Sequence, residues 1–182
     1  MKIRRFGILI FSALILTISG CMNRNEITVN EIWEEPDGAY TIPLNISEWS
    51  VEKEPEGEFH FWNQTNEKFS FSISKWEKLQ FPEEFDYEGY YMGYVEDIRM
   101  EFPEVEGTGL EIIELEDTKL VQMGVRYEVS ETLSQVTTSM ISIPNSEDSL
   151  CFVAIYPAEN SKGFEEMYKK IVTGIRFDLE KE

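Results

Sequence analysis

The first twenty-one residues, Met1 to Cys21, constrain this chain most, because they decide which part of it remains to fold and in which compartment. Lys2, Arg4 and Arg5 give a positively charged start, and an apolar run follows at 6–18. This is the layout of a secretory signal peptide. The run is too short to span a bilayer comfortably, since a spanning helix needs about 20 apolar residues.

The apolar run closes with Ile18-Ser19-Gly20-Cys21, which resembles the lipobox of bacterial lipoproteins. In a lipobox, a branched aliphatic residue and two small residues precede the cysteine that is lipidated and becomes the new N-terminus. We therefore expect residues 1–20 to be removed, and lipid on Cys21, including palmitate, to anchor the protein on the extracytoplasmic face of a bacterial cell membrane. The alternatives are an uncleaved N-terminal anchor and an ordinary signal peptide with a chance cysteine.

The net charge of the remaining chain narrows the choice of partners. Cleavage before Cys21 leaves 162 of the 182 residues, about one domain's length. The removed segment carries three of the 16 basic residues, so 13 basic and 35 acidic side chains remain, with a formal charge of −22. This charge disfavours nucleic acid as a partner and favours a basic protein or peptide. Acidic charge also serves solubility alone.

Residues 21–38 are polar and acidic, and they end in the turn-rich segment Glu34-Glu35-Pro36-Asp37-Gly38. We interpret them as an acidic tether, although Trp33 and its apolar neighbours would allow part of it to pack on the domain. The folded domain is expected at 39–182.

Alternation of apolar and polar residues predicts an antiparallel sheet. Strands are expected near 40–44, 49–51, 59–61 and 69–73, then at 110–115, 121–129, 133–143 and 150–156. Residues 63–66 fit a hairpin turn, and the short links between the last four strands favour an antiparallel meander. The run at 150–156 is apolar on both faces, which indicates a central strand.

Two helices are predicted from a different periodicity. Apolar residues recur at Tyr91, Val95, Ile98 and Phe102, which indicates an amphipathic helix between Pro82 and Pro103. A second helix is expected near the C-terminus. Its signals are Ser161 as N-cap, an apolar stripe of Phe164, Met167, Ile171 and Val172, and Gly174 just past its end.

This order of elements resembles the PsbP/DcrB-like superfamily. The residues that carry the resemblance are Tyr40-Thr41-Ile42-Pro43-Leu44 with Trp49, and a last helix that starts at Ser161-x-x-Phe164 and ends near Ile175 to Phe177. The resemblance covers residues 39–178. It implies an α+β fold, an antiparallel sheet of about six to seven strands flanked by two main helices. It also implies a binding or scaffolding role, as in lumenal and periplasmic lipoproteins, but a fold does not by itself assign a function.

The sequence contains no recognisable catalytic constellation, cofactor motif or metal-binding pattern. His60 is the only histidine, and it lies between Phe59 and Phe61 on the opposite face of a predicted strand, where an imidazole is more often structural than catalytic. Cys151 has no basic neighbour in sequence to activate its thiol, so we expect a small buried residue there. We therefore expect no enzyme activity.

The segment 85–94 contains four tyrosines, a composition typical of recognition surfaces. Tyr91 and Tyr94 fit the buried stripe of the helix, which leaves Tyr87 and Tyr90 as the candidate binding pair. The preferred function is a non-catalytic binding or accessory module for an envelope protein or peptide. The alternatives are a structural envelope lipoprotein without a discrete ligand and a hydrolase with unidentified carboxylates.

Overall fold

The computed structural model describes residues 32–66, 68–82, 84–116, 118–129, 131–159 and 162–178. The predicted signal peptide and Cys21 lie outside the described residues. None of the described helices is long and apolar enough to cross a membrane.

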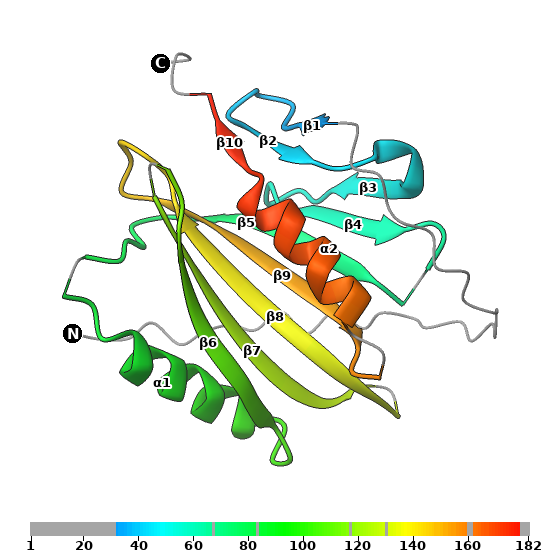
Figure 1. Ribbon diagram of the computed structural model, residues 1–182, viewed down its shortest axis with the longest axis vertical. Helices are drawn as coiled ribbons and strands as arrows, with labels where there is room; N and C mark the ends of the chain where they lie inside the picture. The colour runs from blue at the N-terminus through cyan, green and yellow to red at the C-terminus, as the bar shows by residue number, and fades with distance from the viewer. Residues whose placement is uncertain are drawn as a thin grey trace.

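A seven-stranded sheet forms the centre of the molecule (Figure 1). Its strands are β3 Trp49–Lys53, β4 Phe59–Asn63, β5 Ser70–Trp76, β6 Glu106–Glu114, β7 Lys119–Val129, β8 Thr132–Ser142 and β9 Ser149–Pro157. Their order is β3-β4-β5-β9-β8-β7-β6, and every neighbouring pair is antiparallel. The predicted antiparallel sheet is confirmed, and β9 is its central strand.

Two helices cover opposite faces of this sheet. Helix α2 (Lys162–Thr173) buries Met167, Ile171 and Val172 in the larger apolar cluster, against residues of β4, β5 and β9. Helix α1 (Tyr87–Arg99) buries Val95 and Ile98 against β7 and β8 on the other face. The predicted arrangement of one sheet flanked by two main helices is therefore confirmed (Figure 1).

Helix α1 begins later than its sequence pattern predicts. The pattern places its start near Pro82, but the side chain of Asp86 accepts a hydrogen bond from the N–H of Gly89 and caps the helix there. The aromatic residues Phe81 and Phe85 precede this cap, and each contacts Tyr87 and Tyr90. The first turn of α1 is thus packed against the segment that precedes it.

A small second sheet extends the folded domain toward the N-terminus. It contains β1 (Ile32–Glu34), β2 (Tyr40–Pro43) and β10 (Arg176–Phe177), with β2 in the middle. The ring of Trp33 packs edge-on against those of Phe59 and Phe61, with centroids 5.2 and 5.1 Å away.

This packing corrects the predicted domain boundary at residue 39. Residues 32–38 belong to the fold, because the carboxylate of Glu35 accepts hydrogen bonds from the N–H groups of Asp37 and Ala39 and closes the turn between β1 and β2. The sequence identified the turn but not the strand before it. The rest of the predicted tether, 21–31, lies outside the described residues.

Local hydrogen bonds explain the predicted hairpin between β4 and β5. The side-chain oxygen of Asn63 accepts from the N–H groups of Thr65 and Asn66, at 3.0 and 2.8 Å, and from the Thr65 hydroxyl. Asparagine favours such turns because its short amide oxygen reaches the backbone just ahead of it.

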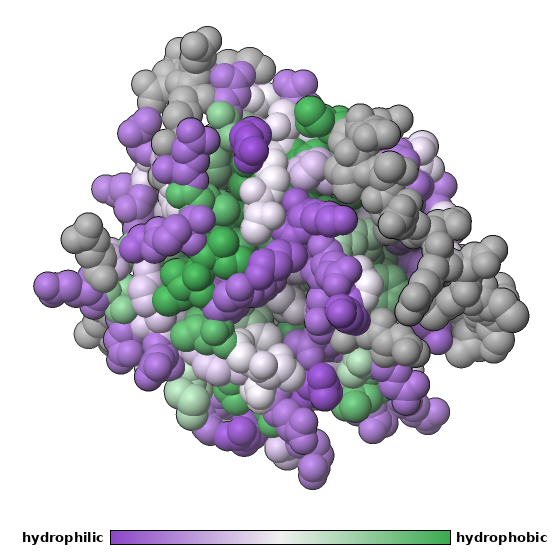
Figure 2. Space-filling model, in the orientation of Figure 1, coloured by the Kyte–Doolittle hydropathy of each residue, from purple (hydrophilic) through white to green (hydrophobic). Residues whose placement is uncertain are grey.

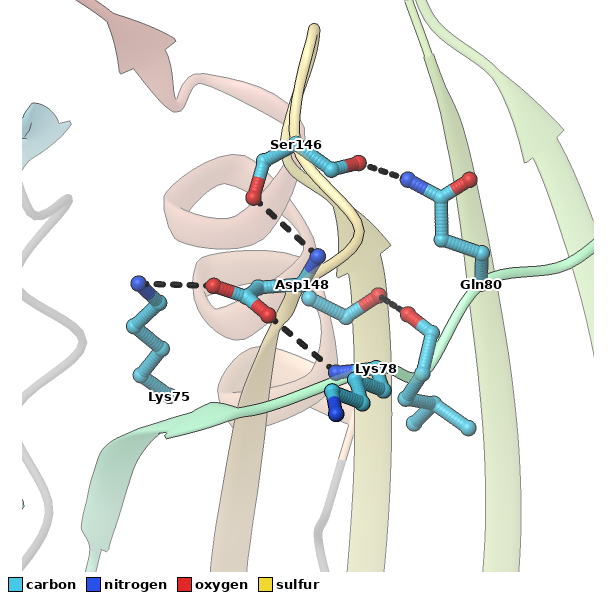
Figure 3. A network of polar contacts seen from close by, with 7 residues as sticks. Lys75, Lys78, Gln80, Ser146 and Asp148 are labelled. Carbon is cyan, nitrogen blue, oxygen red and sulfur yellow. Dashed lines mark hydrogen bonds and ion pairs between the residues drawn. The ribbon is translucent and has the colours of Figure 1, made fainter.

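Hydrogen bonds and an ion pair link the turn between β8 and β9 to the end of β5 and the segment after it (Figure 3). The carboxylate of Asp148 lies 2.7 Å from Nζ of Lys75 and accepts a hydrogen bond from the N–H of Lys78 at 3.1 Å. These two hydrogen bonds lower the pKa of Asp148. The amide of Gln80 donates to the carbonyl oxygen of Ser146. The network therefore positions the segment that leads into α1.

Candidate functional site

An open groove of about 620 Å³ lies between α2 and the strands β6, β7 and β8. Figure 2 shows this side of the molecule, where hydrophilic side chains follow α2 and hydrophobic surface lies over the strands beside the helix. We regard this groove as the candidate functional site, because its floor is polar where a packed sheet face would be apolar.

The register of the strands shows how the polarity of this face changes along its length. At one end, four neighbouring residues across the sheet are apolar: Ile113, Leu120, Ile141 and Leu150. Farther along, the residues that line the groove are polar. They are Gln122 and Arg126 on β7, Gln135 and Thr137 on β8, and Tyr156 on β9. The apolar end packs under α2 as core, whereas the polar end is left open as the groove.

Gly124 makes room for the side chains at the centre of the floor. A Cβ atom at this position would collide with the hydroxyl of Thr108 and lie 3.0 Å from Nε2 of Gln135. Without it, Gln135 reaches across β7 and donates a 2.7 Å hydrogen bond to Thr108 on β6. Because Gly124 has no side chain, polar groups of β6 and β8 meet over β7, and the three strands form one continuous polar surface.

A bulge in β6 lies beside this surface, and a tyrosine of α1 on the other face of the sheet holds the backbone there. The register between β6 and β7 shifts between Gly107 and Gly109, and Gly109 has a φ of 145°, a region that favours glycine. The hydroxyl of Tyr91 on α1 accepts from the N–H of Gly109 and donates to the carbonyl of Gly124, at 2.9 and 3.0 Å. Helix α1 thereby holds the backbone that shapes the groove.

Two buried tyrosine hydroxyls lie at the inner wall of the groove. Tyr168 of α2 hydrogen-bonds to the hydroxyl of Ser139 at 3.0 Å, and Tyr156 of β9 shares a 3.0 Å hydrogen bond with Thr137. Burial raises the pKa of Tyr168 well above its ordinary value and that of Tyr156 to about 12. Both hydroxyls therefore stay protonated at neutral pH and act as hydrogen-bonding groups, not as bases.

Arg126 is half-buried at the polar end of the floor. Gln135 is its neighbour on β8, and Glu106 lies opposite it on β6. Among the described residues, no atom accepts a hydrogen bond from the buried Nε of Arg126, and no carboxylate forms an ion pair with this guanidinium. A half-buried charged side chain without a partner is unusual, so the guanidinium is a candidate ligand contact.

The lysines at the rim of the groove differ from Arg126 because they have partners. Nζ of Lys169 lies 2.6 Å from the carboxylate of Glu111 and links α2 to β6 across the groove. Lys162 lies 3.9 Å from Glu166 on the next turn of α2. Within the described ranges, Arg126 is thus the basic side chain of the groove for which no ion pair is seen.

The candidate pair Tyr87 and Tyr90 lies on the other face of the sheet, away from the groove. Both rings are half-buried in an apolar cluster with Val121, Met123 and Met140, so the premise that they form an exposed pair is wrong. The hydroxyl of Tyr87 is buried without a described partner, and that of Tyr90 contacts the sulfur of Met140 at 3.9 Å. A role of these two residues in binding stays a prediction.

His60 and Cys151 contribute no reactive group to the groove. His60 is more buried than its sequence context indicates, stacks on Trp62 and faces away from α2. Cys151 is buried in β9, and burial raises its pKa to about 12, so its thiol is protonated and unreactive. Within the described ranges, no group of three or more acidic, histidine or cysteine side chains is placed to hold a metal ion.

The residues of the groove were not predicted from the sequence. The available signal was the polar face of two predicted strands: Gln122 and Arg126 alternate with valines and Met123 in one, and Gln135, Thr137 and Ser139 alternate in the next. A polar face usually indicates solvent, yet three of these residues, Gln135, Thr137 and Ser139, are buried. Only the strand register shows that they meet below a helix.

No protein-family model and no curated protein sequence matches this chain. Its structure is similar to the solution structure of the cyanobacterial PsbP (CyanoP) from Synechocystis, with a TM-score of 0.64 and 9% identity over 87% of this chain and 98% of that one. It is also similar to the Ran-binding protein Mog1p of Saccharomyces cerevisiae, with a TM-score of 0.59 and 9% identity over 81% and 94% of the two chains. These similarities show a PsbP- and Mog1-like α+β fold, in agreement with the fold that the sequence resemblance implies.

Proposed function

We propose that this protein is a non-catalytic accessory module that binds a protein or peptide partner in the groove beside α2. The observation that carries the proposal is the groove itself, which has a polar floor and contains the guanidinium of Arg126, with no ion pair to a described carboxylate. The tyrosine hydroxyls in it are protonated, and the carboxylates of Glu111 and Glu166 are paired with lysines. This composition suits recognition better than the alternative of a hydrolase.

The proposal includes an anchor and a charge preference. Lipid on Cys21 would hold the module on the extracytoplasmic face of a bacterial cell membrane. The formal charge of −22 after cleavage would attract a basic partner and repel nucleic acid. The similar fold of Mog1p, a Ran-binding protein, is compatible with a protein partner.

Site-specific photo-crosslinking in cells tests this proposal. A photoreactive amino acid in place of Glu165, on the groove rim, is expected to give one discrete adduct with an envelope protein. The matched control is the same amino acid in place of Met92, which is exposed on α1. Adducts only from Met92 would move the contact to the surface near Tyr87 and Tyr90. No adduct from either position would favour a structural envelope protein without a discrete ligand.

A further inference from the structure

Arg126 has no ion-pair partner among the described residues. In a chain with 35 acidic and 16 basic residues, acidic side chains are abundant. Both groove lysines are paired with them, whereas no described carboxylate pairs with Arg126, although Glu106 is its cross-strand neighbour. Its buried Nε also has no hydrogen-bond partner in the part of the chain that the structure describes, unlike most buried donors.

From this we infer, resting on the proposed function, that Arg126 binds a carboxylate of the partner. A guanidinium also presents its two Nη groups side by side in a plane, and this end-on geometry fits the two oxygens of one carboxylate. Such a pair would neutralise the charge without access to Nε, which is buried. The low exposure of the site would strengthen the interaction relative to one at the open surface.

The charges around Arg126 restrict the amino-acid sequence of the partner segment that carries this carboxylate. Glu106 lies beside Arg126 on β6, and Glu165 lines the groove on the α2 side. These carboxylates would repel a segment with several acidic residues and attract basic side chains on either side of a single acid. The occupant is therefore an internal segment of a protein in which one Asp or Glu is flanked by Lys or Arg.

The test follows the Nε–Hε NMR signals of arginine in the full ¹⁵N-labelled chain, purified in nonionic detergent. The sequence contains only six arginines, so the signal of Arg126 is assigned by its loss in Arg126→Gln. The probe is the peptide acetyl-KGEGK-amide, and its control is acetyl-KGQGK-amide. We expect a saturable shift of the Arg126 signal and at least tenfold tighter binding of the glutamate peptide.

Two variants separate the role of Arg126 from general charge effects. Arg126→Gln, in which backbone amide shifts replace the missing Arg126 signal as the measure of binding, is expected to abolish the preference for the glutamate peptide. Arg99→Gln, which removes an exposed arginine of α1, is expected to retain it. Equal binding of the two peptides, or a preference that survives Arg126→Gln, would overturn the inference.

Two further peptides test the nature of the segment. Tighter binding of acetyl-EGEGE-amide than of acetyl-KGEGK-amide would contradict the inference that basic residues flank the acid. Tighter binding of acetyl-KG with a free C-terminal carboxylate than of acetyl-KGEGK-amide would contradict the inference that the acid is an internal side chain. If the peptide preference is absent but the crosslink at Glu165 persists, only the role of Arg126 fails. Loss of that crosslink is instead a failure of the proposed function.

Discussion

The hydroxyl of Tyr168 is the best-connected side-chain oxygen beneath α2. It lies 3.0 Å from the hydroxyl of Ser139 and 3.3 and 3.4 Å from the carbonyl oxygens of Phe152 and Thr137. By contrast, the hydroxyl of Tyr90 on the other face of the sheet has one hydrogen-bond partner among the described residues, the sulfur of Met140, which is a weak acceptor. These two tyrosines therefore provide a matched comparison.

We expect Tyr168→Phe to lower the free energy of unfolding by about 1–2 kcal/mol, because it leaves buried oxygens without their donor. Tyr90→Phe is expected to change it by less than about 0.5 kcal/mol, since it removes no strong hydrogen bond. Urea unfolding followed by circular dichroism measures both values. Equal losses in the two variants would show that the network below α2 contributes nothing specific.

The exposure of single tyrosines could not be predicted from the helical period alone. Spacings of four and seven residues place Tyr87 on the same helix face as Tyr91 and Tyr94, so its burial follows from the period, whereas Tyr90 lies at the edge of that face. The period takes no account of the rings of Phe81 and Phe85, which lie before the helix and pack against Tyr87 and Tyr90. Burial of Tyr90 therefore depends on a loop conformation that the period does not encode.

At the scale of the element, α1 contains two glycines in different environments. No heavy atom lies within 4 Å of the position that a Cβ of Gly93 would occupy. A Cβ at Gly89 would collide with the carboxylate of Asp86, which caps the helix. The two positions thus separate the intrinsic effect of glycine from the effect of the cap.

Gly93→Ala is expected to raise the free energy of unfolding by about 0.5–1 kcal/mol, because alanine loses less conformational entropy in a helix. Gly89→Ala is expected to lower it by about 0.5–2 kcal/mol through loss of the N-cap. Thermal unfolding of the two variants beside the unsubstituted chain gives the comparison. Stabilisation by both substitutions would contradict the role of Asp86.

Most elements of the fold are predictable from local patterns, whereas the groove is not. Alternation from Leu133 to Ile143 predicts β8, and the apolar run from Leu150 to Tyr156 predicts a central strand, because both signals depend on neighbours in sequence. The groove depends on which residues face each other across strands. Arg126 and Gln135 become neighbours only through the register of β7 and β8.

At the scale of the whole molecule, the domain begins closer to the predicted anchor than the sequence indicated. The ring of Trp33 is packed against Phe59 and Phe61, so at most the residues from Cys21 to Glu31 would remain as a spacer after the proposed cleavage. An extended spacer of this length spans at most about 40 Å. The proposed anchor would therefore keep the groove near the membrane, where an envelope partner would meet it.

The proposed lipid on Cys21 can be tested by metabolic labelling. Growth with a palmitate analogue should label the protein, and Cys21→Ser should abolish the label and release the protein from membranes, because the serine cannot form the thioether. Cys151→Ala is the matched control: its thiol is buried in β9, so this variant should remain labelled. Membrane fractionation and in-gel detection of the label measure both effects. Label and membrane association that persist in Cys21→Ser would leave an uncleaved apolar segment at 6–18 as the anchor, and the lipoprotein proposal would fail.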